Sequence, residues 1–221
     1  MSVNIAIDGP AGAGKSTVAK MAAKELGYIY VDTGAMYRAM AYYLIKRGIG
    51  KDDTDRMARE CQGAEITIRY DNGEQVVMLG NENVNGLIRR EEVGSMASVC
   101  SALAPVREKL TELQKKLARE NNVVMDGRDI GTCVLPNAQV KIYLTADSHV
   151  RAVRRRDELL AKGEKCDLDK IEKDIIERDE RDMTREIAPL KKAEDAVLLD
   201  TSDMDISEVF QSILKICRER E

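Results

Sequence analysis

The feature that most constrains this chain is a glycine-rich segment, GPAGAGKST, at residues 9–17. Gly9 is followed by four residues and then by Gly14, Lys15 and Ser16, which is the spacing of a phosphate-binding loop. An apolar run, VNIAID, precedes the segment, and STVAKMAAKEL follows it with apolar residues at helical intervals. A strand, a loop and a helix in this order are the context that the motif requires. The sequence therefore predicts a P-loop.

The residue types in this loop suit phosphate chemistry. Glycine at positions 9, 12 and 14 can adopt backbone conformations closed to other residues, so that successive N–H groups turn inward and form an anion-binding nest at a helix N-terminus. Lys15 is expected to reach the β- and γ-phosphates of a nucleotide, and the Ser16 hydroxyl to help to hold Mg²⁺. A glycine-rich turn without a ligand is the alternative, which the complete motif in this context disfavours.

Composition limits the remaining possibilities. At 221 residues, 43% of them apolar, the chain can bury the core of one α/β domain with an appendage. Its net charge of −4 gives no general basic field and disfavours non-specific binding of nucleic acid. No apolar run reaches membrane-spanning length and no leader pattern precedes the first strand, so we expect a cytoplasmic protein. Five cysteines without a CxxC pair predict reduced thiols.

Short apolar runs predict the architecture. Four of them follow the first strand, at residues 28–32, 123–126, 140–144 and 196–200, and helical patterns separate them. Nearly continuous apolar runs are typical of parallel strands covered on both faces, so the fold class is α/β with a doubly wound parallel sheet. The first strand and three of the runs end in aspartate, at Asp8, Asp32, Asp126 and Asp200, and these side chains are expected to face the phosphate site.

One segment departs from this pattern. Residues 65–79 alternate apolar and polar side chains around Asn72 and Gly73, which predicts a hairpin and a small antiparallel β insertion. Helices are expected at 91–101 and 105–119, then two highly charged helices at 148–163 and 168–190, and an amphipathic helix at 207–220.

Arginine is the informative residue type for the chemistry. Arg178, Arg181 and Arg185 have the spacing of one helix face, with Asp182 on the same side, and could clamp anions; a solvated face held by salt bridges is the open alternative. A kinase that phosphorylates a phosphate group needs charge neutralisation rather than a base, because its nucleophile is already deprotonated near neutral pH. An alcohol acceptor would need a carboxylate base, and Asp126 and Asp129 keep that alternative open.

Six segments together resemble a known family: DGPAGAGKST, DTGAMYRA, DGRDIGT, VKIYLTA, ERDERDMTR and APL. In this order, over nearly the whole chain, they resemble the bacterial cytidylate kinases, which are P-loop nucleoside monophosphate kinases. The resemblance implies transfer of the γ-phosphate of ATP to CMP or dCMP in pyrimidine nucleotide metabolism, with Mg²⁺ as cofactor. Thr33 stands where some relatives carry serine and keeps the hydroxyl. A kinase of adenylate or shikimate type and an ATP-dependent regulator are the alternatives.

The resemblance also implies residue roles. The expected ATP-binding residues are Gly9, Pro10, Ala11, Gly12, Ala13, Gly14, Lys15, Ser16 and Thr17, with Arg154 and Arg156 from a lid. The expected CMP-binding residues are Thr33, Ser98, Arg107 and Asp129 around cytosine, Arg38 and Arg128 at the acceptor phosphate, and Arg178, Asp182 and Arg185 at the ribose and phosphates. Lys15, Arg128 and Arg185 are the expected catalytic residues, and Ser16 the metal ligand.

The same resemblance implies how the chain is organised. One domain, 1–221, would comprise a core at about 1–62, 103–150 and 186–221, a monophosphate-binding insertion at about 63–102 and a helical lid at about 151–167. The expected partners are ATP and CMP or dCMP, without nucleic acid or membrane, and the expected state is a monomer.

Overall fold

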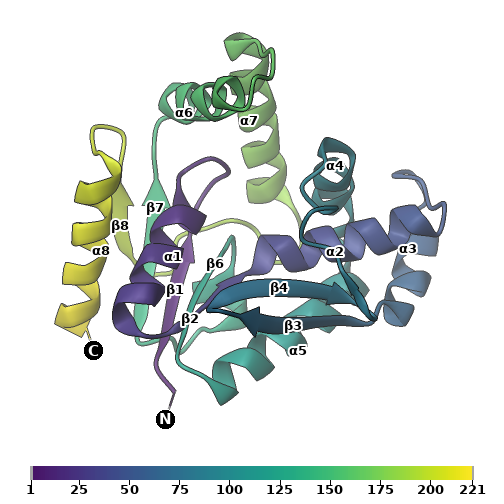
Figure 1. Ribbon diagram of the computed structural model, residues 1–221, viewed down its shortest axis with the longest axis horizontal. Helices are drawn as coiled ribbons and strands as arrows, with labels where there is room; N and C mark the ends of the chain where they lie inside the picture. The colour runs from purple at the N-terminus through teal and green to yellow at the C-terminus, as the bar shows by residue number, and fades with distance from the viewer. Residues whose placement is uncertain (1, 221) are drawn as a thin grey trace.

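A five-stranded parallel sheet forms the centre of the molecule, in the order β2-β6-β1-β7-β8 (Figure 1). The computed structural model describes residues 2–220. The strands are β1 (Asn4–Asp8), β2 (Ile29–Asp32), β6 (Val123–Gly127), β7 (Val140–Thr145) and β8 (Val197–Asp200). All five lie within one or two residues of the predicted runs. From β1 the chain first builds one side of the sheet and later the other, which confirms the doubly wound α/β class.

Helices cover both faces of the sheet, and the strands divide their side chains between them. Ile5 and Ile7 of β1 pack in one buried cluster, whereas Ala6 packs in the other. Val124 and Met125 of β6 divide in the same way, because successive side chains of a strand point to opposite faces. The helices of the first face are α1 (Lys15–Leu26) and α8 (Ile206–Arg220), and those of the second are α2 (Thr33–Lys46) and α5 (Ala104–Glu120).

The predicted antiparallel insertion is present between α2 and α5. Asn72 and Gly73 have φ angles of 49° and 80°, the conformation that a two-residue hairpin turn requires. The Gln75 side chain fastens the hairpin to β2: its amide oxygen accepts from the Asp32 N–H at 2.8 Å and its amide nitrogen donates to the Asp32 carbonyl at 3.2 Å. The elements of this region are α3 (Thr54–Glu60), β3 (Ile66–Asp71), β4 (Glu74–Leu79), β5 (Glu82–Asn83) and α4 (Glu91–Cys100).

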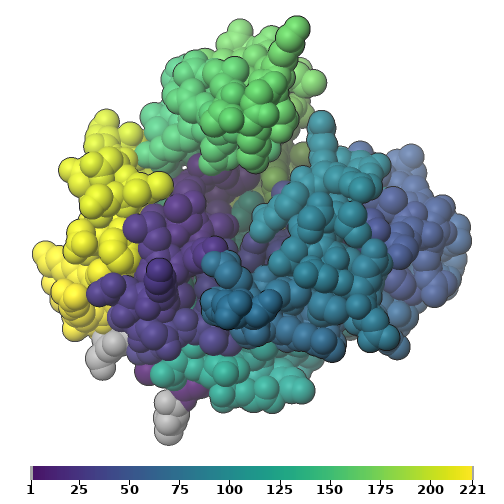
Figure 2. Space-filling view, viewed as in Figure 1, coloured from purple at the N-terminus to yellow at the C-terminus, as the bar shows by residue number. Residues whose placement is uncertain are grey.

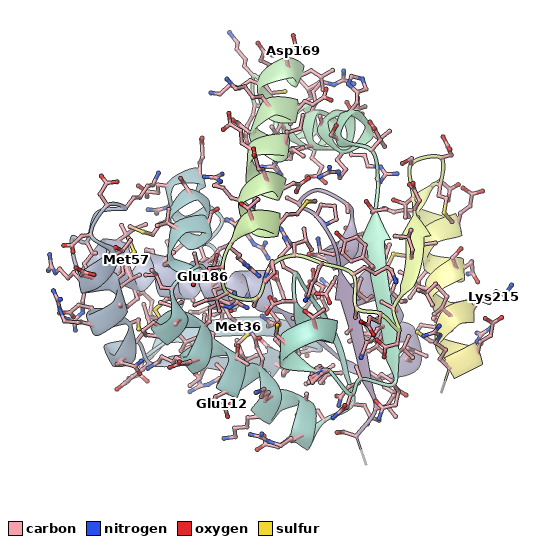
Figure 3. All side chains as sticks on the ribbon, turned by 180° about the vertical axis from the view of Figure 1, so that it is seen from behind. Met36, Met57, Glu112, Asp169, Glu186 and Lys215 are labelled. Carbon is pink, nitrogen blue, oxygen red and sulfur yellow. The ribbon has the colours of Figure 1, made fainter. Side chains whose placement is uncertain are left out.

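Two helices, α6 (Ser148–Ala161) and α7 (Leu168–Thr184), stand above the carboxyl edge of the sheet, and we call them the projecting helices (Figure 1). In the view from behind, Asp169 marks the far end of α7 and Glu186 lies just past its base, beside the core (Figure 3). None of the helices within residues 2–220 combines the length and the hydrophobicity needed to cross a bilayer.

The prediction of one long helix at 168–190 is wrong at its C-terminal end. The helix ends at Thr184, Ala188 has a φ of 51°, and the Leu190 N–H donates back to the Asp182 carbonyl at 2.8 Å. Pro189 disfavours helical backbone at the residue before it, so the chain turns back instead. Arg185 therefore lies beyond the helix and does not share a helix face with Arg178. This correction brings Arg185 towards the sheet.

Candidate active site

The P-loop joins β1 to α1 with the backbone that its glycines allow. Gly9, Gly12 and Gly14 have φ angles of 149°, 74° and 83°. At Gly9 a Cβ atom would lie 1.9 Å from the Leu144 carbonyl oxygen of β7, so no other residue fits there. The prediction of a strand, a glycine-dependent loop and a helix is confirmed. The loop presents its backbone at the N-terminus of α1, where anions bind favourably.

Lys15 is buried, and the nearby carboxylates only partly offset the cost of burying its charge. Its Nζ donates to the Pro10 carbonyl at 2.7 Å, across the loop. Burial, and then the positive charge of Arg128, lowers the Lys15 pKa to about 7, although Asp126 and Asp8 act in the opposite direction. An anion bound in the loop would stabilise the charged form of Lys15 and raise its pKa.

A group of oxygen atoms lies beside Lys15 at the start of α1. The Ser16 hydroxyl donates to one Asp126 oxygen at 2.7 Å, and the Tyr30 hydroxyl donates to the other at 3.0 Å. Burial, and then the nearby Asp32, raises the Asp126 pKa to about 6. Hydroxyl and carboxylate oxygens suit Mg²⁺, which keeps much of its coordination for water and nucleotide phosphates. Residues 2–220 contain no cluster of three or more His, Cys, Asp or Glu side chains that could hold a metal ion.

At the carboxyl edge of the sheet, arginines and aspartates from three parts of the chain come together. Arg107 of α5 forms a buried ion pair with Asp129, and Arg185 donates to the second oxygen of Asp129 at 3.2 Å. Arg128 donates to Asp182 of α7 at 2.8 Å. The structure thus brings together five of the predicted CMP-binding residues, which lie far apart in the sequence.

This cluster carries excess positive charge. Burial, and then Arg128, lowers the Arg178 pKa to about 10, and the Arg178 Nε is buried without a hydrogen-bond partner. Burial, and then neighbouring arginines, also lowers the pKa values of Arg38 and Arg185. Burial alone would raise the pKa of Asp182, but Arg128 and other arginines hold it below its usual range. Such a site favours a bound anion.

Several buried hydroxyls lack a hydrogen-bond partner among the described residues, and one of them, on Tyr37, lies beside the Arg107–Asp129 pair. The Ser98 Oγ and the Tyr37 hydroxyl are buried and have no hydrogen-bond partner, whereas the Thr33 Oγ1 donates to the Asp126 carbonyl at 2.7 Å. The Tyr37 ring lies under the Arg107 guanidinium, 5.6 Å from its centroid, and burial raises the Tyr37 pKa to about 12. Tyr37 was missed in the sequence, although its place beside Arg38 in DTGAMYR was a usable signal.

The arginines at the base of the projecting helices face in several directions. Arg154 donates to the Thr201 carbonyl at 2.6 Å, and Arg156 pairs with the exposed Asp157 at 2.8 Å. Their assignment to ATP stays a prediction. Arg155 pairs with Glu158 at 3.1 Å, and its positive charge contributes to the lowered pKa of Arg38. Arg151 is buried and contacts the P-loop itself, a contact that the sequence did not reveal.

Three of the four strand-end aspartates lie near the start of α1. Asp126 accepts the Ser16 hydroxyl, Asp32 lies beside Asp126, and Asp8 is close enough to Lys15 to raise its pKa. The Asp8 carboxylate also accepts the Ile130 and Gly131 N–H groups at 2.8 and 2.7 Å, and so holds the short helical turn that follows Asp129. Asp200 is exposed at the sheet edge, where it accepts from the Ser202 hydroxyl at 2.6 Å. The expectation that all four face the phosphate site is therefore wrong for Asp200.

The P-loop and the arginine cluster lie on two sides of one recess. In the space-filling view this recess opens between the projecting helices (green), the P-loop with α1 (purple) and the insertion (blue) (Figure 2). The arrangement can hold two phosphorylated ligands end to end, one on backbone N–H groups and the other on guanidinium groups.

Similar proteins identify the family. The family model described as Cytidylate kinase matches residues 5–219. A cytidylate kinase of Caldicellulosiruptor bescii is 48% identical over 214 residues, which are 97% of this chain and 95% of the relative. A cytidylate kinase of Listeria monocytogenes serotype 4a is 51% identical over 213 residues, which are 96% of this chain and 94% of the relative.

Solved structures agree on the fold at lower similarity. A gluconokinase from Sinorhizobium meliloti 1021 aligns with a TM-score of 0.51 and 13% identity over 99% of this chain and 93% of its own. An uncharacterized protein from Eubacterium ventriosum aligns with a TM-score of 0.56 and 13% identity over 99% of this chain and 100% of its own. The architecture is that of small P-loop kinases, and the sequence match over nearly the full length assigns the chain to the cytidylate kinase family.

Proposed function

We propose that this protein transfers the γ-phosphate of ATP to the phosphate of CMP, and of dCMP, giving ADP and the nucleoside diphosphate. The observation that carries the proposal is the arginine cluster opposite the P-loop. Arg38, Arg107, Arg128, Arg178 and Arg185 outnumber the carboxylates that act on them, which are Asp129, Asp182 and, near Arg38, Asp32. A second anion opposite the ATP phosphates would balance this charge and use the unpartnered Arg178 Nε.

The donor side would act through the loop backbone and Lys15. The N–H groups of residues 9–17 would hold the ATP phosphates. The Lys15 ammonium would stabilise the negative charge that develops on the β–γ bridging oxygen as the bond to the γ-phosphoryl group breaks. A bound Mg²⁺ would supply further charge neutralisation. Ser16 would be its direct ligand, and Asp126 fits a supporting role because it already accepts the Ser16 hydroxyl at 2.7 Å.

The acceptor side would act through guanidinium groups. Arg38 and Arg128 would hold the CMP phosphate in line with the γ-phosphoryl group, and Arg185 would reach both the acceptor and the transferring group. No base is needed, because the attacking phosphate oxygen is mostly deprotonated near neutral pH. Alignment and charge neutralisation therefore account for the catalysis.

The cytosine would lie beside the Arg107–Asp129 pair. The Asp129 carboxylate suits the N4 amino donor of cytosine, and the Arg107 guanidinium suits its N3 or O2 acceptors. Uracil presents an oxygen where cytosine has the amino group, so it would leave buried polar groups unpaired at about 1 to 3 kcal/mol each. Ser98, with its unpartnered Oγ, and Thr33 would complete the contacts. Asp182 and Arg178 would adjoin the ribose, and acceptance of dCMP requires that no contact to the 2′-hydroxyl be essential.

A comparison of acceptors tests the proposal. ADP formation is measured by a coupled assay with ATP, Mg²⁺ and CMP, dCMP, UMP, AMP or shikimate in separate reactions. Stimulation by CMP and dCMP well above the other acceptors is expected. Preference for AMP or shikimate would favour another small-substrate kinase, and slow hydrolysis that no acceptor stimulates would favour an ATP-dependent regulator.

The organisation of the chain also remains a proposal. Residues 63–102 would be the acceptor-binding insertion and residues 151–167 part of a mobile lid, and the charge of Arg155 on α6 already acts on Arg38 of the arginine cluster. We expect a monomer in the cytoplasm without nucleic-acid or membrane partners. Sedimentation equilibrium with and without both nucleotides checks the oligomeric state.

A further inference from the structure

A buried ion pair connects both projecting helices to the P-loop. Arg151 lies in the first turn of α6, and Asp179 lies near the end of α7. Their side chains meet with an Arg151 Nη1 to Asp179 Oδ2 distance of 2.6 Å, and they are 7% and 9% exposed. No solvent screens a pair at this depth, so its geometry and its remaining hydrogen bonds decide what it does.

Those remaining hydrogen bonds go to the P-loop residue Ala11. The Arg151 Nη1 also donates to the Ala11 carbonyl at 2.9 Å, and the second Asp179 oxygen accepts the Ala11 N–H at 3.2 Å. The Arg151 Nε donates to the Ala146 carbonyl at 2.8 Å, which fixes the guanidinium relative to the end of β7. Both polar backbone groups of Ala11 are thus bound by side chains from the two projecting helices.

The next residue of the loop is packed against the same two helices. A Cβ atom at Gly12 would lie 3.5 Å from the Arg151 Cβ and 3.8 Å from the Ile175 Cδ1. The loop therefore rests on the bases of α6 and α7 at two consecutive residues. A movement of α6 or α7 would therefore shift the backbone of Ala11 and Gly12, because both helices contact these two residues directly.

We propose that Arg151 and Asp179 are positioning residues for the donor nucleotide: they set the orientation of the Ala11 peptide groups and couple the P-loop conformation to the placement of α6 and α7. The inference rests on the proposed function for its kinetic consequence, but it concerns ATP binding and does not depend on which acceptor is used. Neither residue needs to touch the reacting atoms.

The first experiment removes the negative charge with little change of shape. Asp179→Asn keeps an oxygen for the Ala11 N–H but places an uncharged amide against the Arg151 guanidinium. The KM for ATP is expected to rise on the order of tenfold, with the KM for CMP within twofold of the wild-type value. ATP binding measured by calorimetry without acceptor should weaken by the same factor, and amide hydrogen exchange in residues 9–17 should accelerate.

The matched control is Glu172→Gln. Glu172 also joins α7 to α6, through His149 at 2.8 Å, but no hydrogen bond connects it to the P-loop. Its kinetic constants and loop exchange should match those of the wild type. Equal effects of Asp179→Asn and Glu172→Gln would overturn the proposal, because any loosening of the two helices would then suffice.

A second variant separates positioning from stability. A buried ion pair can often be replaced by apolar side chains without loss of stability, so Arg151→Met with Asp179→Leu should recover thermal stability if Asp179→Asn has lost it. This double variant cannot restore the hydrogen bonds to Ala11, so the raised KM for ATP should persist. Recovery of ATP affinity together with stability would show that the pair is only structural. Failure of the wild type to use CMP would reject the proposed function and leave the ATP-binding test intact.

Discussion

The two halves of the proposed active site are built in different ways: the P-loop is the proposed donor half, and the arginine cluster with its neighbouring side chains is the proposed acceptor half. The donor half is a continuous segment of nine residues, in which backbone groups and one lysine do most of the work. The acceptor half is made of side chains from α2, α4, α5, the end of β6 and the end of α7. The donor half therefore depends on glycine conformations that are fixed locally, whereas the acceptor half depends on how distant parts of the chain pack together.

The difference also concerns charge. The donor half holds a single buried cation that has little opposing charge, and the acceptor half holds a network of arginine–aspartate pairs with a surplus of arginine. A change in the donor half should therefore affect all acceptors alike, and a change in the acceptor half should alter the choice between them. The predictions below test this division, from the largest expected effect to the smallest.

The largest effect is expected for Lys15→Met. The variant removes the cation that would stabilise the negative charge developing on the leaving phosphate. The kcat should therefore fall about 10²- to 10³-fold, as for the loss of one preorganised charge-stabilising group. The loss should be the same factor with CMP and dCMP. Steady-state kinetics with both acceptors measures this, and circular dichroism with thermal unfolding checks that the fold is kept. A loss that differs tenfold between the acceptors would contradict the division.

Next in size is the effect of Asp129→Asn, which removes the carboxylate between Arg107 and Arg185. We expect kcat/KM for CMP to fall about 100-fold, corresponding to about 2.7 kcal/mol, because cytosine loses an acceptor and two arginines lose their partner. The KM for ATP should stay within twofold. Initial rates with each substrate varied in turn supply both constants.

The matched control for that variant is Asp195→Asn. Asp195 also pairs with a buried cation, Lys141, at 2.7 Å, but its own side chain is 62% exposed and Lys141 packs on Gly131. It should leave both kinetic constants unchanged. If Asp129→Asn instead impaired ATP and CMP use equally, Asp129 would be structural and the acceptor half would not be a separate unit.

The two halves also differ in how well they can be predicted from the sequence. The P-loop and all five strands were predicted because a local pattern fixes each of them: one spacing, or one apolar run. Residues 9–17 carry their function in one segment, so no knowledge of the packing was needed. The hairpin at Asn72 and Gly73 was predicted for the same reason, since its turn needs positive φ at both residues.

The acceptor half could not be derived in this way. The Arg107–Asp129 and Arg128–Asp182 pairs join residues 22 and 54 positions apart, and only the resemblance to a family proposed them as one site. Arg151 and Asp179 were missed because a buried ion pair in two charged helices has the same local pattern as the exposed pairs around it. The helix end at Thr184 was missed because Pro189 acts four residues upstream: it has no N–H to donate to the Arg185 carbonyl, as a continued helix would require.

A smaller effect, on proton binding, tests the electrostatics of the donor half. The ligand-free Lys15 pKa of about 7 should rise when phosphate oxygens bind, so ATP binding at pH 8, where ATP itself is deprotonated, should take up close to one proton. Calorimetry in buffers of different ionisation enthalpy measures the uptake. Lys15→Met is the control, because it should lose the uptake at pH 8.

The same shift predicts how stability depends on pH. The folded-state pKa of Lys15 lies below the unfolded value of 10.5, so the unfolded chain binds more protons between about pH 7 and pH 10.5. The contribution of Lys15 to the free energy of unfolding should therefore rise with pH across this window. Urea unfolding at pH 7 and pH 9 should show a smaller increase for Lys15→Met than for the wild type. Identical increases would mean that Lys15 keeps its proton in the empty loop.

The smallest effect is expected for Tyr37→Phe, and it sharpens the comparison because its two readouts have opposite signs. The Tyr37 hydroxyl is buried without a partner, so its removal should raise the free energy of unfolding of the ligand-free protein by up to about 1 kcal/mol. If the substrate supplies the missing partner, the KM for CMP should rise about threefold to tenfold while the KM for ATP stays constant. The ring under the Arg107 guanidinium is retained, so the Arg107–Asp129 pair should keep its geometry. Urea unfolding and CMP kinetics on the same preparation measure both effects. A variant that is stabilised but binds CMP unchanged would show that this hydroxyl is a packing defect outside the acceptor site. A rise in both the free energy of unfolding and the KM for CMP would show that the acceptor half, unlike the P-loop, gives up stability to keep polar groups free for its ligand.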